Sequence, residues 1–332
     1  MQNIRLTTAT DVLAAVPAIL GFVPTDSVVM VSLIERGGEP TTLGFVARTD
    51  AAAAAPIYAY RQAIAQAAVT AVIWVVVGTG GVAAAGLDQI DESRRELDTM
   101  GIRTVRTLVA QSLEFGAEWF DLDGHESGLT TDPNLSDTSL AHALEGRQTV
   151  SSRDEIAARF TEGEAADMDA AHATAREQGE DFVRLTITEF AAALRGRKTP
   201  SLELVARIGV CATMRARYRD ALIGVIAISA PAAQDAFTAA AAHLRGNERL
   251  QVLTLAGLAA YVAHNGPVAG IAFQTAHGIN DHAAHTGLLD LLDKSLEMGV
   301  PPSDIAELVA TGIEVAQSLG IDIETGTDYT TQ

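Results

Sequence analysis

The chain has 332 residues, a length that fits two domains or one large one. Almost half of the residues are apolar but only 5% are aromatic, so the core is expected to rely on small and aliphatic side chains. The formal net charge is -19, and Lys and Arg form no cluster. Because such a surface repels phosphate groups, we expect no nucleic-acid partner and no binding to an anionic membrane.

Cysteine usage and hydropathy predict a cytoplasmic location. Cys211 is the single cysteine, so the chain forms no intrachain disulfide, which fits a reducing compartment. Its apolar, helical-looking surroundings favour a small core residue over a nucleophile. Asp11 and Pro17 interrupt the first apolar stretch, and no apolar run approaches the length of about 20 residues that spans a bilayer.

The first predicted element is a helix. Thr8 and Asp11 have the spacing of a capping box, in which each side chain accepts a bond from the other residue's backbone. Apolar residues then follow helical spacing as far as Leu20. Pro17 is expected to kink or end this helix, and Gly21 to supply a left-handed stop.

Next comes an alternation of strands and helices that predicts an α/β domain with a mixed sheet. A short turn makes the first two strands antiparallel, and a wholly apolar third strand is expected to be covered on both faces. The expected strands are Val28–Leu33, Thr41–Arg48, Ala71–Val77, Arg103–Ala110 and Glu118–Leu122, and the expected helices are Ala51–Val69 and Gly86–Met100.

Residues 121–139 are rich in Gly, Asp, Ser and Thr, which indicates a long loop near a domain boundary. From about Leu140 onward the pattern is helical, including one long helix over Ser201–Ile228. We therefore predict an α/β domain over 1–138 and an all-α domain of helical hairpins over 139–332. The hairpins are expected to pack like tetratricopeptide repeats, although no second copy appears at a fixed period.

Gly78, Gly80 and Gly81 belong to a G-x-G-x-x-A pattern, Gly78–Ala83, between a predicted strand and a predicted helix. Backbone N–H groups at such a helix start hold phosphate groups in dinucleotide-binding proteins. The acidic residue that normally follows about 20 positions later, at the end of the next strand, is missing. A flexible connection in a Gly-rich chain is therefore the favoured interpretation, with phosphate binding as the alternative.

Thr25, Asp26 and Ser27 form a polar cluster between the first helix and the first strand. The favoured interpretation is a turn, in which the Asp26 carboxylate accepts backbone N–H groups. Arg48 is expected to pair with a carboxylate inside the protein or to clamp an anionic ligand. If these residues and the Gly78–Ala83 loop lie at the same sheet edge, they form one ligand-binding cleft.

No complete metal or catalytic motif is present, so we assign no metal, cofactor or catalytic residue. His277, Asp281, His282 and His285 lie close together, but a turn separates the first from the others, and a polar helix–helix turn is favoured. Asp121-x-Asp123-Gly124 matches only part of a calcium loop. We interpret it as part of a solvated acidic loop, suited to a partner surface or to weak cation binding.

Several segments together resemble the actinobacterial family known as domain of unknown function 4192. They are Val16–Leu33, Glu145–Phe160, Arg217–Gly224, Leu255–Ala276 and Thr286–Pro302. Two features depart from the family pattern: the stretch after Glu118 contains no cysteine, and the segment His264–Gly270 lacks the family's Asp. The resemblance implies an actinobacterium or one of its phages, and it supplies no activity.

Two functions are compatible with the residues themselves, and a third, a role in a phage virion or its assembly, rests only on the taxonomic range that the family resemblance implies. The first is a cytosolic protein-binding or scaffolding module, without catalytic activity, whose helical half binds a protein partner or a second copy. The alternative is an enzyme or sensor that binds a nucleotide or another phosphorylated ligand at the Gly78–Ala83 loop.

Overall fold

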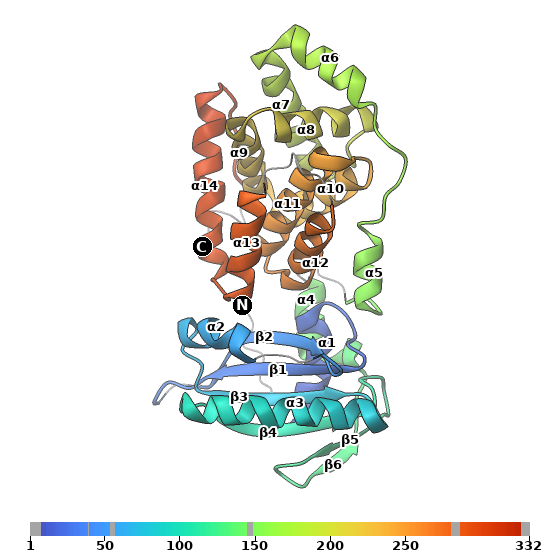
Figure 1. Cartoon of the computed structure of the whole chain (residues 1–332), viewed down its shortest axis with the longest axis vertical. Coiled ribbons are helices and arrows are strands. Elements are labelled where there is room, and N and C mark those ends of the chain that lie inside the picture. The colour runs from blue at the N-terminus through green and yellow to red at the C-terminus, as the bar shows by residue number, and fades with distance from the viewer. Residues whose placement is uncertain (1–7, 39, 54–56, 145–148, 280–285, 327–332) are drawn as a thin grey trace. The chain divides into compact units, whose positions relative to one another are not determined.

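A computed structural model describes residues 8–38, 40–53, 57–144, 149–279 and 286–326 (Figure 1). The chain divides into two compact units. The first comprises Met1–Glu155 with Glu297–Gly299, and the second comprises Ile156–Leu296 with Val300–Gln332. An N-terminal mixed sheet is followed by a helical region, so the predicted fold class is confirmed.

The first unit is built on a six-stranded sheet with the strand order β2-β1-β3-β4-β5-β6. The strands β3 and β4 are parallel, and every other neighbouring pair is antiparallel. Their bounds are β1 Ser27–Ile34, β2 Thr42–Asp50, β3 Ala71–Val77, β4 Arg103–Ala110, β5 Glu118–Asp121 and β6 Ser127–Leu129. Every residue of β3 is buried, as its unbroken apolar sequence predicted.

Helix α1, Ala9–Leu20, begins with the predicted capping box. The backbone N of Thr8 lies 2.9 Å from Asp11 Oδ2, and the backbone N of Asp11 lies 3.1 Å from Thr8 Oγ1. Gly21 has a φ of 73° and supplies the left-handed cap. Pro17 lies inside the helix and does not end it, because most of α1 is buried and its packing offsets the missing N–H.

Helix α3, Gly80–Thr99, lies along one face of this sheet (Figure 1). Alternating residues of β1 and β3, such as Met30 and Trp74, form a core with Ile90 and Leu97 of α3. The helix begins six residues before the expected Gly86, since glycines are tolerated in a first helical turn.

Two other expectations for this unit are corrected. Within the described residues, Ala51–Val69 contains a 3-10 turn, η1 Ile57–Tyr60, and a short helix, α2 Arg61–Gln66, in place of one long helix. Residues 121–139, expected to be a loop, contain the turn of a β5–β6 hairpin, β6 itself and η2 Pro133–Leu135, and α4 Asp137–Leu144 begins there. Polar and glycine-rich composition did not exclude a short hairpin.

The second unit is helical. Its elements, with α5 crossing the boundary, are α5 Arg153–Ala158, α6 Met168–Gln178, α7 Glu180–Arg195, α8 Leu202–Met214, α9 Ala216–Gly224, η3 Val225–Ile228, α10 Ala230–Ala242, α11 Gly246–Val262, α12 Gly266–His277, α13 Gly287–Glu297 and α14 Pro302–Ser318. The single long helix expected over Ser201–Ile228 is interrupted at Arg215, whose backbone is extended. Tetratricopeptide-like packing stays a prediction.

Close backbone contacts organise this unit. A Cβ added to Gly312 of α14 would lie 2.5 Å from the backbone N of Gly224 in α9, so the two helices touch through their glycines. Arg249 of α11 is 4% exposed and donates hydrogen bonds to the backbone oxygens of Phe160 and Ala241. This side chain therefore ties the segment after α5 to the end of α10.

Within the described ranges, no helix is both long enough and apolar enough to cross a membrane.

Candidate functional site

The structure brings the predicted site residues together at one end of the sheet. Ser27, the first residue of β1, pairs with Asp50 at the end of β2 and with Val77 at the end of β3. Thr25 and Asp26 precede Ser27, Arg48 lies near the end of β2, and the Gly78–Gly81 segment follows β3. The site thus occupies the carboxyl end of the parallel pair β3–β4, where open α/β sheets commonly bind ligands.

Arg48 is bonded within the protein. Its Nε donates to Ser27 Oγ at 2.8 Å, and its Nη2 lies 2.6 Å from Asp50 Oδ1. The Ser27 hydroxyl in turn donates to the backbone oxygen of Thr25 at 2.5 Å. The guanidinium therefore stabilises this turn, and most of its donors point to protein oxygens.

The Asp26 carboxylate does not form the expected cap. Among the described residues, no group donates a hydrogen bond to it, and the backbone oxygen of Asp26 accepts from Ala51 N at 2.8 Å instead. The residue is exposed and has a φ of 47°, a left-handed conformation that is uncommon outside glycine. A free carboxylate in a strained turn is compatible with a binding role.

The glycine segment brings the backbone close to this carboxylate. Gly78 has a φ of 148°, and a Cβ added there would lie 2.6 Å from Val82 Cγ1 and 3.5 Å from Asp26 Oδ1. Gly80, with a φ of 54°, begins α3, and both Gly80 and Gly81 are exposed. Their N–H groups lie in the first turn, where a helix offers no internal acceptor and carries a partial positive charge.

A second feature of the first unit is a concentration of exposed apolar side chains between Phe115 and Leu144, a segment that includes the acidic loop interpreted above as suited to a partner surface. Seven of the twelve exposed large apolar side chains in the described residues lie between residues 115 and 144. We call this set the 115–144 surface: Phe115, Phe120, Leu122, Leu129, Leu135, Leu140 and Leu144. Residues 111–144 also contain seven acidic residues and no Lys or Arg, a signal that was available in the sequence.

Two pairs within this set lie on common faces. Phe120 of β5 pairs with Ser127, and Leu129 of β6 pairs with Glu118, so Phe120 and Leu129 are diagonal neighbours on one face of the hairpin. Leu140 and Leu144 are one turn apart on α4.

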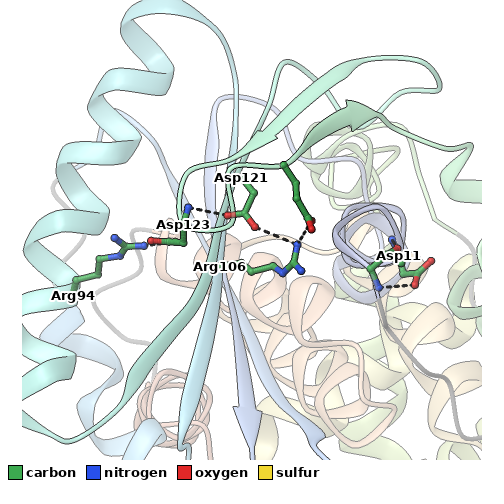
Figure 2. Close-up of polar contacts among 7 residues, drawn as sticks. Asp11, Arg94, Arg106, Asp121 and Asp123 are labelled. Atoms are coloured by element: carbon green, nitrogen blue, oxygen red, sulfur yellow. Dashed lines mark hydrogen bonds and ion pairs between the residues drawn. The ribbon is translucent and has the colours of Figure 1, made fainter.

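A network of ion pairs and hydrogen bonds joins the turn of the β5–β6 hairpin to α3 and β4 (Figure 2). Arg94 of α3 lies 2.6 Å from Asp123 Oδ2, and the backbone N of Asp123 donates to Asp121 Oδ1 at 3.0 Å. Arg106 of β4 lies 3.2 Å from the fully buried Asp121 carboxylate and 2.7 Å from Glu126. The hydrogen bond with Glu126 raises the pKa of Arg106. The carboxylates considered for cation binding are thus paired with arginines.

The remaining predicted residues lie elsewhere. His277 Nε2 lies 3.0 Å from Asp293 Oδ2, while Asp281, His282 and His285 fall outside the described residues. Where the structure describes the chain, no group of three or more His, Cys, Asp and Glu side chains is arranged to hold a metal. Cys211 is fully buried, and burial raises the pKa of its thiol to about 12, so the thiol is protonated at neutral pH.

These observations define a protein with an N-terminal mixed-sheet unit and a helical C-terminal region. The chain belongs to the family described as a domain of unknown function (DUF4192), whose model matches residues 10–303. A comparison with curated proteins gave no match. A comparison with solved structures also gave none.

Proposed function

We propose that this protein is a protein-binding or scaffolding module that binds its partner through the 115–144 surface. One observation carries this proposal: exposed large apolar side chains are concentrated in a segment with seven carboxylates and no basic residue. Contiguous or clustered apolar exposure on a folded protein is typical of interaction sites.

The position of β6 supports a strand-like partner. This strand is the last in the sheet, so one side of its backbone faces no described strand. Such an edge accepts an additional strand from another chain. Phe120 and Leu129 lie on one face of the same hairpin and provide apolar contact for alternate side chains of that strand.

Charge complementarity specifies the partner's chemistry. Glu118 lies on the hairpin face and has no ion pair among the described residues, whereas Glu126 is paired with Arg106 of β4, and residues 111–144 contain no Lys or Arg. A fitting partner is an extended apolar segment flanked by Lys or Arg, whereas a second copy would bring like charges together. In the helical unit, by contrast, the exposed large apolar residues Leu185, Leu202, Met214 and Leu291 are spread over α7, α8 and α13. The partner surface is therefore assigned to the first unit, in place of the helical half expected from the sequence.

A peptide-binding experiment tests this assignment. The probes are a fluorescent peptide of alternating Lys and Val or Ile residues and its counterpart with Glu in place of Lys, titrated with the full chain by anisotropy. We expect binding of the basic peptide only, weakened about tenfold or more in a Phe120→Ser, Leu129→Ser variant. The matched control is Leu185→Ser with Leu291→Ser, which replaces equally exposed residues elsewhere. Equal binding by both variants, or no binding of the basic peptide, refutes the proposal.

A second candidate function is favoured by the short distance between the Asp26 carboxylate and the backbone of the glycine segment at Gly78. We propose as the alternative that this sheet edge binds a nucleotide or other phosphorylated ligand, as an enzyme or a sensor. The Gly80 and Gly81 N–H groups would contact phosphate oxygens, and the Asp26 carboxylate would share a Mg²⁺ ion with them, since Mg²⁺ is commonly held by one or two carboxylates and substrate phosphates.

A thermal-shift measurement with magnesium and ADP tests the alternative. Binding is expected to raise the Tm by a few degrees, and the shift is expected to disappear in Asp26→Asn and in Gly80→Val. Asp88→Asn, an exposed substitution on α3, is the control that retains the shift. Absence of a shift in the native chain, or a full shift in Asp26→Asn, argues against this site.

A further inference from the structure

An open cavity of about 190 Å³ in the second unit is lined by residues of α6 and α8, which pack against each other. Its walls follow from helix geometry, because His172, Ala175 and Arg176 have the i, i+3, i+4 spacing that places side chains on one face of α6. Met214, the last residue of α8, completes the lining. Because Ala175 is small and the backbone becomes extended at Arg215, space remains beside the end of α8.

The charged side chains of this cavity differ in whether the protein supplies a partner. Most arginines in the described part of the chain form an ion pair, as Arg207 does with Glu189. Arg176 is exposed and has no hydrogen bond or ion pair with any described residue. The other charged group, His172, has its Nε2 3.8 Å from Glu248 Oε1 of α11. The guanidinium of Arg176 is therefore the group that is available to a ligand.

The lining residues and the cavity volume restrict the ligand. A guanidinium presents parallel N–H donors that match the two oxygens of a carboxylate. Ala175 and the thioether of Met214 provide apolar contacts for an attached hydrocarbon group. A dianion such as phosphate is disfavoured, because Glu248 lies beside His172 and the chain has a net charge of -19. Since a cavity of about 150 Å³ admits benzene, the volume here is sufficient for one aromatic ring.

We propose that the cavity between α6 and α8 binds a small organic monocarboxylate that carries an aromatic or branched aliphatic group. The carboxylate accepts hydrogen bonds from the guanidinium of Arg176, and the apolar group contacts Ala175 and Met214. All of these residues belong to the second unit. The site is therefore separate from the 115–144 surface and from the sheet edge at Asp26, and it does not rest on either proposed function.

The methyl group of Met214 reports directly on binding in this cavity. The chain contains six methionines, so carbon-13 labelling of their methyl groups gives a simple NMR spectrum, and the signal that is lost in Met214→Leu belongs to Met214. The probes are benzoate and benzamide, a neutral molecule of similar shape, with inorganic phosphate as a competitor. We expect benzoate to shift the Met214 signal saturably, with a Kd on the order of 1 mM. Benzamide is expected to cause no saturable shift, and phosphate is expected not to displace benzoate.

Two variants with the same change in net charge test the role of the guanidinium. Arg176→Gln alters an exposed residue and is expected to weaken benzoate binding about tenfold or more. The matched control is Arg95→Gln, which removes an exposed arginine of α3 in the first unit and is expected to retain the native affinity.

Several results would overturn the proposal. It is wrong if benzoate causes no saturable shift of the Met214 signal, or if benzamide acts as strongly as benzoate. It is equally wrong if Arg176→Gln binds benzoate with the native affinity, or if an equal concentration of phosphate displaces benzoate, which would indicate a general anion site. The Asp26→Asn chain and the Phe120→Ser, Leu129→Ser chain are expected to keep the shift, so failure of either proposed function is distinguishable from failure of this site.

Discussion

The contact between α9 and α14 predicts that Gly312→Ala destabilises the helical unit. A Cβ at this position would lie 2.5 Å from the backbone N of Gly224 and 2.8 Å from the backbone oxygen of Asp220. Both distances are below normal van der Waals contact, and both atoms belong to the backbone of α9. A flexible side chain could rotate away, but here the two helices must separate.

The magnitude follows from two opposing effects. Replacing a helical glycine by alanine favours the helix by up to about 1 kcal/mol. Overpacking a tight contact costs typically 1–3 kcal/mol, and the rigid backbone of α9 places this site toward the upper end. The expected net effect is a loss of about 1–2 kcal/mol in the free energy of unfolding.

The matched control is Gly270→Ala in α12. Its Cβ would lie 3.6 Å from Leu296 Cδ2, an ordinary contact, so the helix-propensity gain is expected without the steric cost. Urea unfolding of each full-length chain is followed by far-UV circular dichroism, which is dominated by the helical unit. Tryptophan fluorescence follows the first unit, because Trp74 and Trp119 both belong to it. A Gly312→Ala chain with the same dichroism midpoint and slope as the native chain, or with a higher midpoint than Gly270→Ala, refutes the reasoning.

Other predictions rest on buried polar groups. Cys211, with its pKa raised to about 12, is expected to resist a thiol reagent in the native state and to react fully in denaturant, and fast native-state labelling would contradict its burial. The free energy of unfolding is expected to fall as the pH rises from 9 toward 12, by up to about 1.4 kcal/mol per pH unit for each group. The sign follows because burial raises the pKa values of both Cys211 and Tyr261 to about 12, so the unfolded chain loses these protons first. A urea midpoint that stays constant over this range would be inconsistent with both shifts. Arg249→Met leaves two backbone carbonyl groups without their buried donor and is expected to cost about 2–5 kcal/mol, measured by urea unfolding against the exposed control Arg184→Met.

Local signals in the sequence determined much of the fold. The unbroken apolar run of β3, the capping box at Thr8 and the left-handed Gly21 each depend on residues close together in the chain. The start of α3 and the break at Arg215 were mispredicted because propensity is a weak guide where tertiary packing decides. At Gly80 a glycine begins a helix, and at Arg215 the backbone becomes extended within an otherwise helical sequence.

The candidate sites depend on contacts between distant segments. The proximity of Asp26 to Gly78 follows from the β1–β3 pairing, which joins strands separated in the sequence by β2, η1 and α2. The sequence could suggest that both segments were unusual, but the register that joins them was not visible in either one. The sequence also did not predict that the Asp26 carboxylate accepts no hydrogen bond from a described residue, since an Asp in a turn normally accepts hydrogen bonds from neighbouring backbone N–H groups.

The contact between Gly224 of α9 and Gly312 of α14 also affects the order in which parts of the protein fold during synthesis on the ribosome. The six strands of the sheet, as far as the structure describes the chain, have all been synthesised by Leu129, so the sheet is available to fold early. Helix α9 must wait for α14, which emerges only after Pro302, before its backbone surface at Gly224 is covered. A nascent chain paused before that point therefore exposes the side of α9 that Gly312 later covers, and this backbone surface is open to a chaperone until α14 has emerged.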